Sequence, residues 1–155
     1  MKSQIIKLMA LMLVLAGSLA SCKEQEISEP FITVGQGYLS GAGSEGIPKQ
    51  GIVIETQEKW EDLKMAMDLI NTVTNSFKDP EIDFDRYLLI AVFDEVHYSG
   101  DWDINVICIT EYSDRIIINV AVKNHNRETS PQLITQPYQI VKISKKNKKV
   151  EFLYT

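Results

Sequence analysis

The chain has 155 residues, of which 45% are hydrophobic and 24% charged, and its formal net charge is −5. These proportions are ordinary for a globular protein and exclude a chain that is disordered throughout. An acidic protein also lacks the positive footprint that nucleic-acid binding requires, so we expect no nucleic-acid partner.

The first 21 residues have the order of a removable export signal. Lys2 and Lys7 make a positive start, Leu8–Ala16 supplies a short apolar run, and small residues follow. The end, Leu19-Ala20-Ser21-Cys22, resembles the bacterial lipobox, in which the cysteine is acylated and becomes the new N-terminus. We therefore expect a mature chain of 134 residues and net charge −7, anchored to the membrane by acyl chains on Cys22.

Residues 22–30 are predicted to be the acylated cysteine and a solvated tether. Lys23-Glu24-Gln25-Glu26 is free of apolar residues and resembles the acidic export tags of surface lipoproteins in the Bacteroidota. No later stretch approaches the roughly 20 apolar residues of a membrane-spanning helix. We expect the protein in the bacterial cell envelope, on the outer membrane or cell surface, held by lipid alone.

Residues 31–155 are long enough for a single globular domain with its own core. Phe31–Leu39 alternates loosely and predicts one short strand, and the glycine-rich Ser40–Gly51 predicts a loop. The loop leads into the strand-like Ile52–Ile54, whereas a phosphate-binding loop would open a helix, so the loop predicts no phosphate site.

A helix is predicted to begin after Thr56, a residue type that favours helix N-caps. Apolar residues then recur at helical spacing: Trp60, Leu63, Met67, Ile70 and Val73. This pattern predicts an amphipathic helix of about five turns, which fades in the polar run 72–76 and ends before Pro80.

The remaining apolar segments predict strands: Arg86–Phe93, Ile104–Ile109, Ile116–Val122, Tyr138–Ser144 and Val150–Tyr154. The second has apolar residues on both faces, so Cys108 is expected to be a small buried hydrophobe. The last two are expected to form a hairpin, with the lysines of 142–149 holding its tip in solvent. The predicted fold class is α+β, with one amphipathic helix packed on a mostly antiparallel, meander-like sheet.

Connections in a meander alternate between the two ends of the sheet. The long loops Asp94–Trp102 and Asn124–Gln136 should therefore lie together at one end. The short turns Glu111–Asp114 and Lys145–Lys149 should lie at the other. Because function concentrates on loops held by a rigid scaffold, we look for a binding site at the long-loop end.

Four residues of that end are candidates for binding a partner: His97, Tyr98, Trp102 and His125. Large aromatics in a polar loop suit recognition; the alternative is that they pack over the end of the sheet. Ser99 and Ser130 could act as nucleophiles beside the histidines, but neither lies in a nucleophile-elbow motif. The sequence therefore predicts no catalytic residues and no enzyme.

Acidic residues around His97 raise a metal hypothesis; the set is Asp94, Glu95, His97, Asp101 and Asp103. Asp101 opens a segment like an EF-hand loop. The glycine and glutamate that such a loop needs at its sixth and twelfth positions are replaced by Val106 and Tyr112. We therefore predict a solvated turn entering a strand, with no metal site and no cofactor.

From Trp60 onward, the order of features resembles the C-terminal domain of the PrcB family, lipoproteins that accompany and stabilise a subtilisin-like protease complex at the bacterial surface. The resemblance spans about two-thirds of the chain, and the stretches that carry it are Trp60–Leu63, Ile82–Phe84, Leu88–Phe93 and Thr135–Ile143. Where that family has a Thr-Gly-Gly-Tyr-like turn, this chain has Tyr98-Ser99-Gly100-Asp101-Trp102. This turn resembles the Gly-rich recognition loops of chagasin-like cysteine-protease inhibitors.

The family resemblance implies a lipid-anchored, non-enzymatic interaction module that stabilises or modulates a protease complex. Its partners would be the membrane, through Cys22, and an envelope protein or protease. The turn at Tyr98 implies the alternative, a protease inhibitor of chagasin-like character.

Overall fold

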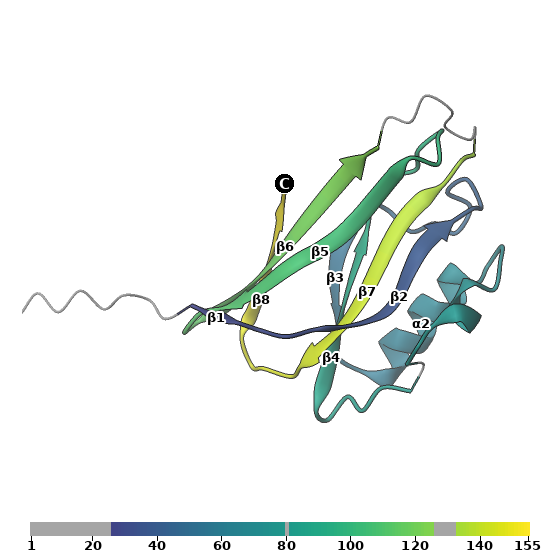
Figure 1. Ribbon diagram of the computed structural model, residues 1–155. Helices are drawn as coiled ribbons and strands as arrows, with labels where there is room; N and C mark the ends of the chain where they lie inside the picture. Colours follow the sequence, from purple (N-terminus) through teal and green to yellow (C-terminus); the bar gives the residue numbers. More distant parts are fainter. Residues whose placement is uncertain (1–25, 80, 126–132) are drawn as a thin grey trace, which may run out of the picture.

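The computed structural model describes residues 26–79, 81–125 and 133–155 (Figure 1). The predicted export signal and Cys22 lie outside the described residues. Within these ranges the chain forms one α-helix and two mostly antiparallel four-stranded sheets, so the protein is mainly β. None of the helical segments within these ranges has the length and apolar character needed to cross a bilayer.

The inner sheet is the middle layer, with the helix on one side and the second sheet on the other (Figure 1). Its strand order is β2 (Ile32–Leu39), β7 (Gln136–Ser144), β4 (Tyr87–Phe93) and β3 (Gln50–Ile54), and each neighbouring pair is antiparallel. Both faces of β4 and β7 are covered, which explains why these strands are apolar at almost every position.

The outer sheet has the order β1 (Ile27–Ser28), β5 (Trp102–Glu111), β6 (Arg115–Asn124) and β8 (Lys149–Tyr154). Strands β6 and β8 run parallel, and the other pairs are antiparallel. The predicted alternation in β6 is confirmed, since Ile116, Ile118 and Val120 are buried toward the inner sheet. Strand β1 lies in the predicted tether, so the ordered fold begins before Phe31.

Helix α2 (Gln57–Met67) begins as predicted, with the Thr56 side chain accepting a hydrogen bond from the Lys59 N–H. The predicted length of about five turns is wrong, because the helix ends at Met67, with Asp68 as its C-cap. The carboxylate of Asp68 accepts hydrogen bonds from the N–H and hydroxyl of Thr74, the second residue of the short 3₁₀ helix η2 (Val73–Ser76). A side chain that bonds ahead along the chain competes with continuation of the helix.

Two cores hold the three layers together. Between α2 and the inner sheet, Trp60 is fully buried and its ring stacks on Phe77 at 5.7 Å between centroids. Between the two sheets, aliphatic side chains from β4, β5, β6 and β7 interdigitate. The helix, the inner sheet and the outer sheet are therefore joined by burial of apolar surface.

The predicted single meander-like sheet and its C-terminal hairpin are wrong. Strand β7 pairs with β2 and β4 in the inner sheet, whereas β8 pairs with β6 in the outer sheet. The connection between β7 and β8 therefore crosses from one sheet to the other. The sequence prediction failed here because a connection of this length can either form a hairpin or cross between two sheets.

The lysines of 142–149 were expected to hold the hairpin tip and edge in solvent. Lys145 and Lys149 are exposed, but the expectation is wrong for the other three, which are half-buried in ion pairs. Lys146 and Lys148 both form ion pairs with Glu111, at 3.1 and 2.6 Å, and Lys142 pairs with Asp79. The two pairs with Glu111 tie the connection to β5 at the short-turn end, which we define by the turns 111–114 and 145–148.

The expectation that Cys108 is buried is wrong, because its side chain is exposed. A β-bulge between Val106 and Cys108 shifts the register of β5 against β6. The extra residue breaks the alternation, so that Ile107 and Cys108 are both exposed and Ile109 returns to the core.

Candidate functional site

The long-loop end consists of the β4–β5 loop (94–101) and the described ends of the β6–β7 connection (His125 and 133–135). His97 and Thr135 exchange main-chain hydrogen bonds of 2.8 and 2.9 Å, and the His125 N–H donates to the Asp101 carbonyl at 2.9 Å. For the described ends of the loops, the prediction that the two long loops lie together is therefore confirmed, although the topology differs from the meander that suggested it; residues 126–132 of the second loop lie outside the described residues.

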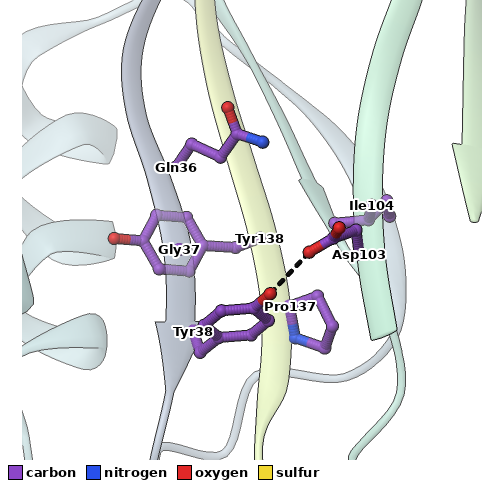
Figure 2. Close-up of a pocket in the computed structure, with 7 residues that line it drawn as sticks. All are labelled: Gln36, Gly37, Tyr38, Asp103, Ile104, Pro137 and Tyr138. Atoms are coloured by element: carbon purple, nitrogen blue, oxygen red, sulfur yellow. Dashed lines mark hydrogen bonds between the residues drawn. The ribbon is translucent and has the colours of Figure 1, made fainter. Parts of the chain in front are cut away.

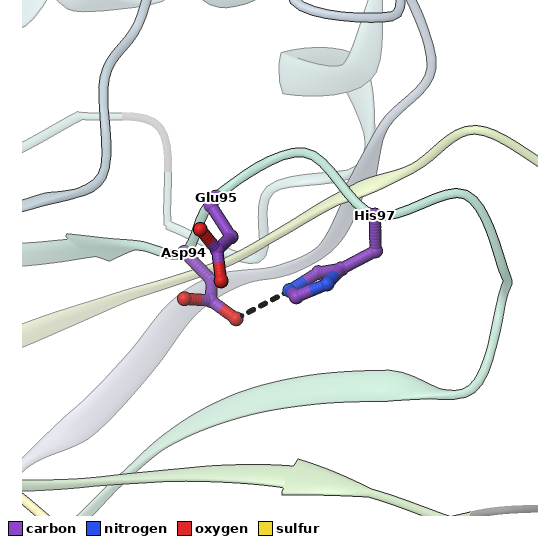
Figure 3. A group of neighbouring side chains, drawn as sticks. All are labelled: Asp94, Glu95 and His97. Atoms are coloured by element: carbon purple, nitrogen blue, oxygen red, sulfur yellow. Dashed lines mark hydrogen bonds and ion pairs between the residues drawn. The ribbon is translucent and has the colours of Figure 1, made fainter.

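Asp94 is the buried centre of this end. One carboxylate oxygen lies 2.8 Å from Lys49 Nζ. The other lies 2.7 Å from His97 Nε2, as Figure 3 shows. Burial by itself raises a carboxyl pKa, but the hydrogen bonds from Lys49 and His97 outweigh it and hold the pKa of Asp94 below its usual 3.8. The bond to Asp94 raises the pKa of Lys49 in turn. The result is a fixed ion pair at the base of the loop.

His97 and Trp102 form the second element of the site. Their rings stack with centroids 4.1 Å apart and an angle of 5° between the planes. The side chain of His97 is buried, so its imidazole is held by Asp94 at its edge and by the indole on its face. For Trp102, the sequence left recognition and packing open; the structure shows that it packs within the end of the sandwich.

Tyr98, the residue next to His97, is 80% exposed. The backbone on its N-terminal side is bonded to Thr135 through His97, and the Ser99 carbonyl accepts a hydrogen bond from the Thr135 hydroxyl at 3.3 Å. The phenol therefore stands in solvent on a loop whose backbone is braced on both sides.

His125 is placed beside this group by a different set of bonds. Its Nε2 lies 2.5 Å from one Asp103 oxygen, and the Tyr38 hydroxyl donates to the other oxygen at 2.5 Å. Tyr38, Asp103 and Tyr138 line a cavity of about 160 Å³ between the two sheets. In Figure 2 the hydroxyl of Tyr38 points to Asp103, whereas that of Tyr138 points away toward the helix side.

The structure thus brings His97 and Trp102 into contact, leaves Tyr98 protruding, and joins His125 to the same end through Asp103. Sequence reasoning missed Lys49, Tyr38 and Gln136. The Gln136 amide donates to the carbonyls of Ile47 and Asp94, at 2.7 and 2.8 Å, and so fixes the loop from below. No local pattern marks these residues, because their partners lie far away in the sequence.

The metal hypothesis can be weighed against this geometry. The ligand atoms of Asp94, Glu95 and His97 lie within 4.8 Å of one another, a spacing that could hold a cation (Figure 3). Lys49 already places a positive charge at one Asp94 oxygen, and the imidazole of His97 occupies the other. Protein groups therefore already contact both oxygens of Asp94, and the absence of a metal site stays a prediction.

Catalysis can be weighed in the same way. Each imidazole is bonded to a carboxylate, His97 to Asp94 and His125 to Asp103. Covalent hydrolysis through such a pair requires a serine or cysteine nucleophile at the imidazole as well. Among the hydrogen bonds between described residues, neither imidazole is bonded to a serine or a cysteine.

Comparisons with protein-family models, with curated proteins and with solved structures gave no match to this chain.

Proposed function

We propose that this protein is a lipid-anchored, non-enzymatic interaction module of the bacterial envelope that binds a partner protein through the tip of the β4–β5 loop. The observation that carries the proposal is Tyr98, an aromatic side chain that is 80% exposed on a braced loop. Large aromatic side chains dominate the energy of protein interfaces when a partner buries them.

Bracing of the loop favours binding, because the loop backbone loses little conformational freedom when a partner binds. Main-chain bonds at His97, the stacked Trp102 and the buried Asp94 fix the backbone around Tyr98. A tyrosine side chain adds only two rotatable bonds to this rigid base. The entropic cost of placing the phenol against a partner is therefore small.

The position of the loop relative to the anchor supports the same function. The described chain starts at Glu26, whose carboxylate accepts a hydrogen bond from the Tyr112 hydroxyl at the short-turn end, and β1 pairs with the last residues of β5. The long loops lie at the other end of β5, a strand of 10 residues. At about 3.3 Å per residue, this places Tyr98 roughly 30 Å from the point where a lipid tether would join.

The protease-associated role comes from the PrcB resemblance and the lipid anchor from the lipobox at Cys22. A rigid loop that presents Tyr98 away from the anchor suits a subunit that stabilises or modulates a protease complex. The runner-up function, protease inhibition, is favoured by the same protruding turn. The two are distinguished by adding purified protein to cysteine and serine proteases, because only an inhibitor slows their turnover.

Capture of envelope proteins by the lipidated chain tests the proposal. Tyr98→Ala should reduce recovery of the specific partner at least roughly tenfold, because a central interface aromatic contributes about 2 kcal/mol or more. Its thermal midpoint should stay unchanged, since an exposed side chain adds little to stability. Met65→Ala is the matched control, because Met65 is 65% exposed but lies on α2. Equal recovery with both variants would refute a contact at Tyr98.

A further inference from the structure

The two sheets have edge strands, and most of these edges are blocked. Strand β2 has a bulge, and its Val34 carbonyl accepts a hydrogen bond from the Lys78 N–H. Strand β1 covers only Thr110 and Glu111 of β5, so the rest of β5 is also an edge; it has a bulge, and its Val106 N–H donates to the side chain of Gln139. The β8 edge carries the charged pair Lys149 and Glu151. Bulges, charges and capping groups of these kinds prevent an edge from pairing with another chain.

Strand β3 has none of these protections among the described residues. It pairs with β4 over Gln50–Ile54 without a register shift, and its sequence, Gln-Gly-Ile-Val-Ile, contains no charge and no proline. It is the last strand of the inner sheet, so no described strand lies on its other side. Alternate main-chain N–H and C=O groups of β3 therefore face outward without a strand partner.

A groove runs beside this edge. It has a volume of about 450 Å³ and lies between β3 and one stripe of helix α2. The stripe consists of Lys59, Asp62, Leu63 and Ala66, which share one face of a helix by their spacing. Ile52 and Ile54 line the strand side. The groove therefore has apolar walls, an open strand edge and a polar rim.

We propose that the β3 edge and this groove bind an extended segment of a partner polypeptide as an added strand. Main-chain groups of the segment would pair with β3, and every second side chain, apolar in character, would point into the groove beside α2. The length of β3 suits a segment of about five residues. This site is separate from the tip of the β4–β5 loop and goes beyond the proposed function.

The occupant is a free segment of a partner and not β3 of a second copy. In any copy of this chain Ile54 is 2% exposed, because it is already packed in the core beneath that copy's own α2. Ile54 is therefore not available to fill the groove of another copy, and Gln50 and Ile52 on the same face of the strand are already half-buried. An extended segment brings its side chains unpacked and can fill the groove.

The test uses the purified full chain and a defined probe, the peptide acetyl-Lys-Thr-Val-Thr-Ile-Thr-Lys-amide. Amide hydrogen exchange should slow roughly tenfold or more within Gln50–Ile54 when the peptide is added in excess. The same peptide with alternate amide nitrogens methylated keeps the side chains and charges but loses main-chain donors. It should give no protection of β3.

Two tryptophan variants complete the experiment. Ala66→Trp fills the groove from the helix and should abolish protection of β3. Met65→Trp places the same side chain on an exposed neighbouring position and should leave protection unchanged. Absence of protection, equal protection by the methylated peptide, or protection that rises with protein concentration alone would overturn the proposal. None of these outcomes depends on Tyr98, so each is separate from the loop-end test.

Discussion

Side chains from three separate parts of the chain meet at Asp94, two on its carboxylate and one on its main-chain carbonyl. Lys49 precedes β3, His97 lies in the β4–β5 loop, and the Asp94 carbonyl is bonded by Gln136 of β7. From the sequence, His97, Tyr98, Trp102 and His125 could be predicted to share one end, because strand connections restrict where loops lie. The roles of Lys49 and Gln136 could not be predicted, since pairing across such separations depends on the sheet order.

Asp94→Asn should lower the free energy of unfolding at pH 7 by about 1–3 kcal/mol, because it removes a buried, hydrogen-bonded charge. The pKa of Asp94 is below 3.8 in the folded protein, so its contribution is present above that value and is lost as the pH falls through the folded pKa. Urea denaturation from pH 7 to about pH 2.5 should therefore show a flatter pH dependence for the variant.

Asp114→Asn is the matched control for this change, because Asp114 is largely exposed and its ion pair is with the adjacent Arg115. Its stability should differ from that of the original chain by less than about 0.5 kcal/mol. An unchanged pH dependence in Asp94→Asn would show that the ion pair with Lys49 does not support the fold.

At the scale of elements, local patterns predicted the strand β6 and the start of α2, because alternation and an N-cap act within a few residues. The end of α2 was predicted too late, since the bond from Thr74 to Asp68 replaces the next helical turn. The hairpin of β7 and β8 was wrong for a different reason. Which sheet a strand joins depends on how the two cores pack. The sequence of the strand itself does not indicate which sheet that will be.

Trp60→Ala should lower the free energy of unfolding by about 3–5 kcal/mol, because the indole is fully buried between α2 and the inner sheet and stacks on Phe77. Chemical denaturation measures this change. Met65→Ala on the exposed side of the same helix should cost less than about 0.5 kcal/mol. A loss below about 1 kcal/mol for Trp60→Ala would mean that the helix contributes little to the core.

At the scale of the whole molecule, the two ends of the sandwich have different chemistry. The short-turn end carries Lys146 and Lys148 on Glu111, and the described chain begins there beside Tyr112. The long-loop end carries the exposed Tyr98 and the buried pair of Asp94 and Lys49. A lipid anchor joined near the first end would leave the second end directed away from the membrane.

Cys22→Ala should abolish acylation and leave the protein unprocessed or soluble, because the thiol is the acceptor in the predicted lipobox. Membrane fractionation and intact mass measure this directly. A Cys108→Ala variant is the control, and it should fractionate with the membrane as the original chain does. Normal fractionation and a normal mature mass in Cys22→Ala would contradict the lipoprotein assignment.

Photo-crosslinking in the native envelope tests the central claim most directly. A photoreactive phenylalanine analogue placed at position 98 should join the protein to one discrete partner on illumination, because Tyr98 forms the tip of the proposed contact. The same analogue at position 65, on the exposed side of α2, should give no such product. A partner that crosslinks from position 65 and not from position 98 would contradict the assignment of the long-loop end as the binding site.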